Sequence, residues 1–310
     1  MTMITPRLIL TALAGLLTAA VPAAALAQTL PLQASPDCRL RIDTAATNWI
    51  IDGYDLFGGG AATAAYDVLF VNQGERECRF YPRFDTDQTT LGLRANGSAA
   101  VPYTLLDTFG QYDATPVAGR TVRRTINPPV VLAPGGQQLV RYLFTVGVDG
   151  LHGDGLFTQR LLLTTEDLAG NPLTQRQVLV GINVSPSATM SLAGAFTRNG
   201  SQADVDLGDL SAGVGAIPLA LQVMSTRGYR LGITSLNGGR LRLMGTDWSV
   251  PYTLSVQGQP IRFGEGAGYV SGNSPGIHRD TLPLAFTVGP VSDLRAGSYS
   301  DILTITVATL

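Results

Sequence analysis

The stretch that decides the fold is Leu139-Val140-Arg141-Tyr142-Leu143-Phe144-Thr145-Val146. Val140, Tyr142, Phe144 and Val146 recur at every second position, and successive side chains of a strand point to opposite faces. Such alternation is typical of a half-buried β-strand and leaves little room for a helix, whose apolar residues recur every three to four positions. This segment therefore predicts a strand over residues 139–146.

The same period of two recurs along the chain, and glycine-rich turn clusters such as Phe57-Gly58-Gly59-Gly60 separate the runs. Helical periodicity is almost absent, so we predict an all-β protein. The runs before the middle of the chain contain Cys38, Leu40 and Ile42; Tyr66, Val68 and Phe70; Cys78 and Phe80; and Val178, Val180, Ile182 and Val184. Those after it contain Met190 and Leu192; Val205 and Leu207; Leu219, Leu221 and Val223; Tyr229, Leu231 and Ile233; Val250 to Val256; Leu282 to Val288; and Leu303, Ile305 and Val307.

Ser185-Pro186-Ser187 interrupts the alternation, and proline cannot donate a hydrogen bond to a strand ladder. We place a domain boundary there. The number of runs on each side suits one β-sandwich. The predicted fold is two tandem immunoglobulin-like β-sandwiches, over residues 28–185 and 186–310.

Composition excludes several function classes. The chain has 310 residues, and all 21 of its basic residues are arginine. The absence of lysine rules out a phosphate-binding loop ending in lysine and a pyridoxal Schiff base. A net charge of -2 offers a nucleic acid little attraction, so we expect no nucleic-acid partner.

The first 27 residues have the pattern of a secretory signal peptide: Arg7, the apolar run Leu8 to Leu17, and a small-x-small cleavage site at Ala25-Leu26-Ala27. Export to an oxidising compartment favours a disulfide between Cys38 and Cys78. The alternative is a pair of buried free thiols.

Residues 296–307 read Ala-Gly-Ser-Tyr-Ser-Asp-Ile-Leu-Thr-Ile-Thr-Val, and earlier segments include Gly228-Tyr229-Arg230-Leu231 and Val250-Pro251-Tyr252-Thr253-Leu254. In these segments residues 186–310 resemble the spore coat protein U-like domain, the pilin module of archaic chaperone-usher pili. The resemblance implies a sandwich without its last strand, an outer-membrane usher, and a periplasmic chaperone and a neighbouring subunit that each supply a strand. It also implies that the closing strand lines the acceptor cleft, with Tyr299, Leu303, Ile305 and Val307.

An internal pilin needs a donor segment of about a dozen alternating residues ahead of its first strand. The stretch Thr29–Asp37 contains Pro31 and Pro36 and makes a poor donor. We therefore expect a subunit at the pilus tip, on the cell surface, whose first domain adheres to a host or abiotic surface. The alternative is a self-standing secreted or periplasmic carbohydrate-binding protein with two complete sandwiches.

Two apolar loops are candidates for surface binding. Tyr54, Leu56 and Phe57 run into a glycine turn, and Phe109 and Tyr112 form a second group near Leu105 and Leu106. Exposed at a loop tip, such rings bind apolar surfaces or stack on sugars. The alternative is that these residues belong to the core.

Two polar groupings predict no chemistry. Gly272-Asn273-Ser274-Pro275-Gly276 matches a hydrolase elbow and is followed by His278 and Asp280, but an elbow needs a strand and a helix around it. Asp149, His152 and Asp154 lie among glycines and suit a turn better than a metal site. We expect no enzymatic activity, no cofactor and no metal. A secreted hydrolase would require Ser274 and His278 to meet.

Overall fold

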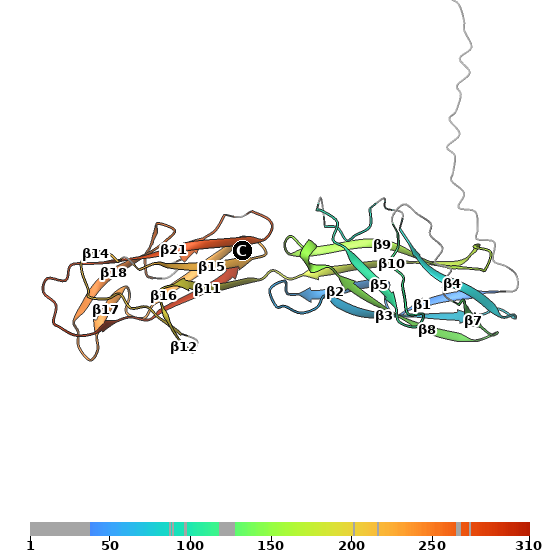
Figure 1. The fold of residues 1–310 in the computed structure, drawn as a ribbon, viewed down its shortest axis with the longest axis horizontal. Coiled ribbons are helices and arrows are strands. Elements are labelled where there is room, and N and C mark those ends of the chain that lie inside the picture. Colours follow the sequence, from blue (N-terminus) through green and yellow to red (C-terminus); the bar gives the residue numbers. More distant parts are fainter. Residues whose placement is uncertain are drawn as a thin grey trace, which may run out of the picture. The chain divides into compact units, whose positions relative to one another are not determined.

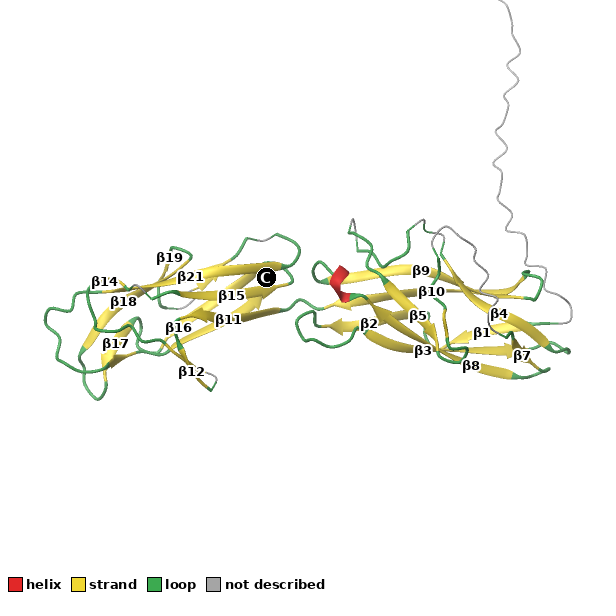
Figure 2. Ribbon diagram, in the orientation of Figure 1, coloured by secondary structure: helices red, strands yellow, loops and turns green. Residues whose placement is uncertain are grey.

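The computed structural model describes residues 38–86, 88, 90–95, 98–117, 128–200, 202–215, 217–264, 268–272 and 274–310. These residues form strands and loops, with a single 3-10 turn at Val148–Gly150 (Figures 1 and 2). The predicted all-β fold of tandem sandwiches is confirmed. The predicted signal peptide, residues 1–27, lies outside the described residues. Within the described part of the chain we find no helix with the length and hydropathy of a membrane span.

The first sandwich has two five-stranded sheets that enclose one core. All pairs are antiparallel except β2–β10, which is parallel. One sheet has the order β1 (Leu40–Thr44), β3 (Thr63–Asn72), β8 (Gln137–Val146), β5 (Tyr103–Asp107) and β6 (Tyr112–Asp113). The other has the order β2 (Asn48–Tyr54), β10 (Pro172–Val184), β9 (Gly155–Glu166), β4 (Cys78–Asp85) and β7 (Val130–Leu132).

Aromatic rings fill the centre of this core. The indole of Trp49, on β2, stacks on Tyr66 with 5.1 Å between ring centroids and meets the edge of Phe84 at 5.8 Å. Trp49 and Tyr142 are fully buried. Because these rings come from strands of both sheets, their packing holds the sheets together.

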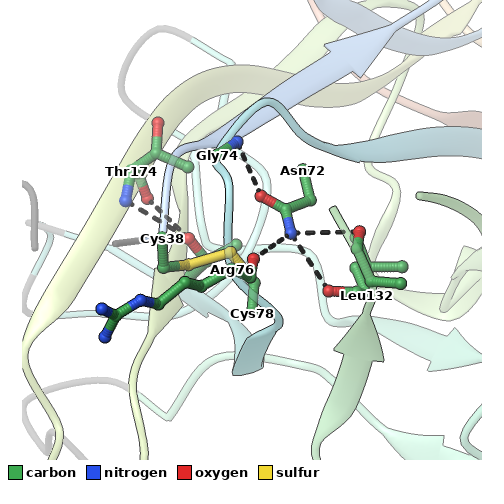
Figure 3. The surroundings of a disulfide bond; sticks show 9 residues. Cys38, Asn72, Gly74, Arg76, Cys78, Leu132 and Thr174 are labelled. Atoms are coloured by element: carbon green, nitrogen blue, oxygen red, sulfur yellow. Dashed lines mark hydrogen bonds between the residues drawn. A yellow bond between two sulfur atoms is a disulfide. The ribbon is translucent and has the colours of Figure 1, made fainter. Parts of the chain in front are cut away.

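The predicted disulfide between Cys38 and Cys78 is confirmed, and it closes a separation of 40 residues (Figure 3). Beside it, the buried amide of Asn72 donates hydrogen bonds to the carbonyl oxygens of Arg76 and Leu132, at 2.7 and 3.1 Å. Its carbonyl oxygen accepts one from the Gly74 amide at 2.9 Å. The covalent bond and this amide fix the same end of the sandwich.

The second sandwich has its own core and two sheets of unequal size. The large sheet has the order β11 (Ala188–Gly194), β15 (Leu219–Ser225), β21 (His278–Val288), β18 (Ser249–Val256), β17 (Arg240–Leu243) and β22 (Tyr299–Ser300), with β14 (Gly213–Val214) beside β21 and β19 (Gln259–Ile261) beside β18. The small sheet has the order β20 (Gly268–Val270), β16 (Tyr229–Ser235) and β23 (Leu303–Thr309). A hairpin, β12 (Thr197–Asn199) and β13 (Gln202–Asp204), stands apart.

Only residues 185–187 separate the end of β10 at Val184 from the start of β11 at Ala188. The boundary placed between residues 185 and 186 falls within this connection. The domain ranges 28–185 and 186–310 stay predictions.

Candidate functional site

The strand β23 forms one edge of the small sheet of the second sandwich, and among the described residues it is paired on one side only. β23 pairs with β16 on one side, with Ile305 opposite Ile233 and Val307 opposite Leu231. On its other side, no strand of the described residues joins the ladder. We call this side of β23, together with the neighbouring strand β11, the open edge.

The backbone hydrogen bonds show which groups face the open edge. Leu310 N donates to Gly228 O at 2.8 Å, and Leu236 N donates to Ile302 O at 2.9 Å. Because an antiparallel ladder uses alternate residues, the even-numbered residues of β23 direct their backbone groups at β16. The N–H and C=O groups directed at the open side belong to Leu303, Ile305, Val307 and Thr309.

Apolar side chains along the open edge are incompletely covered. Leu231 and Ile233, on the inner strand β16, are fully buried. The side chains that point into the core from the two bordering strands are only half-buried, and β11 and β23 lie close to each other there. These half-buried residues are Met190 and Leu192 on β11 and Leu303, Ile305 and Val307 on β23.

The first sandwich supplies an internal comparison. Its sheets also end in edge strands, β1 and β2. On those strands the inward residues Ile42 and Trp49 are 4% and 1% exposed, while Leu40 and Ile51 are half-buried. The edge strands of the first sandwich thus each contribute a fully buried side chain, whereas no side chain of β11 or β23 is fully buried.

A half-buried carboxylate fixes the start of β23. Asp301 accepts hydrogen bonds from Ser235 Oγ at 2.5 Å, Tyr252 Oη at 2.6 Å and the backbone N–H of Asn237 at 3.0 Å. Burial, reinforced by Asp301, raises the pKa of the Tyr252 phenol. Asp301 thereby joins the large sheet to the segment that enters β23.

The predicted closing-strand residues separate into two places. Leu303, Ile305 and Val307 lie on β23 at the open edge. Tyr299 lies on β22, opposite Leu243 of β17 in the large sheet, and its hydroxyl donates to Arg295 O at 2.9 Å. The sequence interpretation took 299–307 as one strand, whereas the structure divides it at Asp301.

The first group of surface-binding candidates lies at the linker end of the first sandwich. Tyr54 is paired with Val184 at the end of β10, and its carbonyl oxygen accepts a hydrogen bond of 2.9 Å from Ser185 N. The Tyr54 hydroxyl donates to Gly60 O at 2.9 Å, and Leu56 and Phe57 are half-buried. These residues thus lie where the chain leaves the first sandwich, and their role in surface binding stays a prediction.

The second group lies elsewhere. Phe109 and Tyr112 border a cavity of about 400 Å³ beside β4 and β7. Phe109 is 56% exposed, and Tyr112 is half-buried against the core. Sequence reasoning missed the other cavity residues, because Arg83, Asp85 and Glu166 are ordinary polar positions of strands until the fold brings them together.

Ser274, His278 and Asp280 do come together, although not as a catalytic triad. His278 Nε2 lies 3.4 Å from Ser274 Oγ and 2.9 Å from Ser274 O, while Nδ1 lies 4.0 Å from Asp280 Oδ2. A carbonyl oxygen only accepts, so the 2.9 Å hydrogen bond uses a proton on Nε2. That nitrogen then cannot accept the hydroxyl proton, which a general base must do.

Among the described residues, no three aspartate, glutamate, histidine or cysteine side chains form a group able to hold a metal ion. Asp149 lies in the 3-10 turn Val148–Gly150, as the predicted turn requires.

No family model and no curated protein matches the sequence. Among solved structures, the chain is similar to one in the chaperone–tip adhesion subunit pre-assembly complex of the archaic Csu pili of Acinetobacter baumannii, at 11% identity, 86% coverage of this chain, 99% of that chain and a TM-score of 0.48. It is similar to CfaE, the adhesive subunit of CFA/I fimbria of enterotoxigenic Escherichia coli, at 12% identity, 84% and 91% coverage and a TM-score of 0.36. A third match is in the Salmonella enterica SafA pilin–SafB chaperone complex, at 12% identity, 87% and 96% coverage and a TM-score of 0.25.

These structural neighbours are pilus adhesins, pilins and chaperone complexes. With TM-scores below 0.5, none of them assigns a function to this chain. The resemblance of residues 186–310 to the spore coat protein U-like domain stays a resemblance of sequence segments.

Proposed function

We propose that the chain is an exported, adhesive subunit of a chaperone-usher pilus, and that its second sandwich accepts a β-strand from a partner chain at the open edge. The observation that carries this proposal is the coincidence, along β23, of unpaired backbone groups and half-buried apolar side chains. Leu303, Ile305 and Val307 contribute to both rows. One added strand would satisfy the backbone groups and cover the side chains together.

The dimensions of the edge suit a single extended segment. The seven residues of β23 span about 23 Å at 3.3 Å per residue. A donor segment with apolar residues at every second position would insert those side chains between β11 and β23 and leave the intervening residues in solvent. Burial at about 25 cal/mol per Å² of apolar surface would supply the driving force.

The open edge also explains why a periplasmic chaperone belongs to the proposal. An exposed strand with an apolar face pairs readily with other chains and promotes aggregation. A chain that is exported in this state needs a partner that covers the edge until assembly, which is the role proposed for a periplasmic chaperone. The usher and the cell-surface location belong to the same proposal.

The tip position and the adhesive role rest on the first sandwich. The connection of three residues between Val184 and Ala188 is too short to donate a strand of about seven residues. The second sandwich therefore has no donor segment directly ahead of it. The proposed arrangement has the second sandwich receive a strand while the first carries the binding surface.

The alternative of a free-standing binding protein with two complete sandwiches requires the chain to close its own open edge. No strand of the described residues does so. A monomer that folds reversibly without a chaperone, and that gains nothing from an added strand, would favour this alternative.

The experiment is to lengthen the chain after Leu310 by a tight turn and a seven-residue strand that alternates valine and threonine. We expect a monomer with a higher thermal unfolding midpoint than the unextended chain. The matched control carries the same residues with the valines grouped together, which destroys the alternation. Equal midpoints for the two extended chains would overturn the proposal.

A further inference from the structure

A cavity of about 400 Å³ in the first sandwich lies on the half remote from the connection to β11. It borders β4 and β7, and it includes Glu166, where β9 ends opposite Pro172 at the start of β10. The 13 residues of β10 then run about 40 Å to Val184. The volume lies within the range of ligand pockets, about 300–1,000 Å³.

Charged side chains that pair with one another form part of the cavity lining. The guanidinium of Arg83 forms ion pairs with Asp85 at 2.8 Å and with Glu166 at 3.0 Å. The Glu166 side chain is 8% exposed, and the Arg83 side chain is 20% exposed. Since each charge is held by a partner, the wall keeps its shape in the absence of a ligand.

Aromatic and apolar side chains also line the cavity. Asp107 Oδ1 accepts hydrogen bonds of 2.8 Å from the backbone N–H groups of both Phe109 and Gly110, and this turn holds the Phe109 ring at the rim. Tyr112 and Tyr81 also border the cavity, and Val131 lies at its margin with half of its surface exposed. Aromatic faces and hydrogen-bonding carboxylates thus border one space.

The charge of the lining restricts the class of ligand. Among the described lining residues, Asp85, Asp107 and Glu166 contribute three carboxylates and Arg83 contributes one guanidinium. Carboxylate oxygens only accept hydrogen bonds, so these groups suit a ligand that offers hydroxyl or ammonium donors better than one whose own contact group is a carboxylate or sulfate. The aromatic lining residues add a preference for an apolar ring face.

We propose that this cavity binds a neutral sugar or an amino sugar of a surface glycan. The sugar's apolar face stacks on the exposed ring of Phe109, and its hydroxyl groups donate to the carboxylates of Asp85 and Glu166. The inference rests on the proposed function, because it gives the adhesive first sandwich a ligand class.

The test measures binding of mannose, galactose, N-acetylglucosamine, glucosamine and sialic acid to the strand-extended chain by calorimetry and by ligand-observed NMR. We expect at least one neutral or amino sugar to bind and sialic acid not to bind. The Phe109→Ala variant should weaken binding about fivefold, since a stacked aromatic contact contributes about 1 kcal/mol. The matched control, Trp248→Ala, removes a 38% exposed ring of the second sandwich and should leave sugar binding unchanged.

Asp85→Asn supplies a second readout, because it keeps the shape of the side chain and removes one negative charge. Compared with the unaltered chain, the variant should lose more affinity for glucosamine, which carries an ammonium group, than for N-acetylglucosamine. Binding of none of the neutral or amino sugars, preferential binding of sialic acid, or equal losses in Phe109→Ala and Trp248→Ala would each overturn the inference. The proposed strand acceptance would stand or fall separately, because the thermal midpoint of the extended chain tests it without any sugar.

Discussion

Tyr252 Oη donates a hydrogen bond of 2.6 Å to Asp301 Oδ2, and this bond joins β18 of the large sheet to the short connection that leads from β22 into β23 of the small sheet. Ser235 and Asn237 donate to the same carboxylate from the end of β16. The open edge therefore starts from a fixed point, although its far side is unpaired. A strand acceptor needs such a point, because an unanchored edge strand would fray before a partner could pair with it.

Asp301→Asn should lower the free energy of unfolding by about 1–3 kcal/mol, since an amide cannot accept all of these hydrogen bonds. It should also reduce the gain in unfolding midpoint that the added strand confers. Urea titration of the extended and unextended chains measures both effects. The control is Asp293→Asn, at an exposed carboxylate earlier in the sequence, which should change neither value.

Tyr252→Phe should flatten the loss of stability at alkaline pH. The raised pKa of Tyr252 means that the fold favours the neutral phenol. Its contribution is complete below about pH 10, the pKa of an unfolded tyrosine, and is lost as pH rises through the higher folded pKa. The free energy of unfolding at about pH 8, 10 and 11 should fall less steeply in the variant than in the unaltered chain. Parallel curves would contradict this assignment.

Tyr103 and Tyr142, both buried in the first sandwich, should respond differently to the loss of their hydroxyl groups. Tyr103 Oη donates to Gln159 Oε1 at 2.8 Å, whereas Tyr142 Oη has no hydrogen-bond partner among the described residues. Tyr103→Phe should lower the free energy of unfolding by about 1 kcal/mol. Tyr142→Phe should leave it unchanged or raise it. The reverse order in thermal unfolding would contradict the described hydrogen bonding.

Proline substitutions in β23 should distinguish its two sides. Val307 directs its N–H at the open edge, so Val307→Pro should retain the fold and remove most of the stabilisation from the added strand. Thr306 directs its N–H at Gly232 of β16, so Thr306→Pro should destabilise the second sandwich itself. The measurement is the thermal unfolding midpoint of each variant, with and without the added strand. Similar effects of the two prolines would show that the assignment of the free backbone groups is wrong.

The disulfide should contribute about 4 kcal/mol to the stability of the first sandwich, from the entropy that a closed loop of 40 residues removes from the unfolded chain. The double variant Cys38→Ser, Cys78→Ser should lose that amount in urea titration. The unaltered chain should match it after reduction with dithiothreitol. Reduction should not change the free energy of unfolding of the double variant.

The alternation of apolar residues was enough to predict the strands and the fold class, because side-chain direction follows directly from backbone geometry. Val140, Tyr142, Phe144 and Val146 are all buried on β8 as expected. Val205 and Leu207 also alternate, but β13 ends at Asp204 and they lie in a loop. A pattern of two positions is too short to exclude a loop that only touches the core.

The pairing of strands was harder to foresee. The parallel pair β2–β10 joins residues about 130 positions apart, and it places the Tyr54 loop at the linker end. Nothing in the local sequence of Asn48–Tyr54 specifies that partner. The cavity wall has the same origin, since Arg83 and Glu166 meet through the register of β4 against β9. Contacts set by register require the whole sheet.

The orientation of the ladder along β23 has a mechanical consequence. Antiparallel hydrogen bonds run perpendicular to their strands, so a borrowed strand pulled along its own length would load every bond of the joint at the same moment. A joint pulled perpendicular to the strand would instead open one bond after another. If the borrowed strands of a fibre lay along its axis, such joints would resist tension although each link is held without a covalent bond.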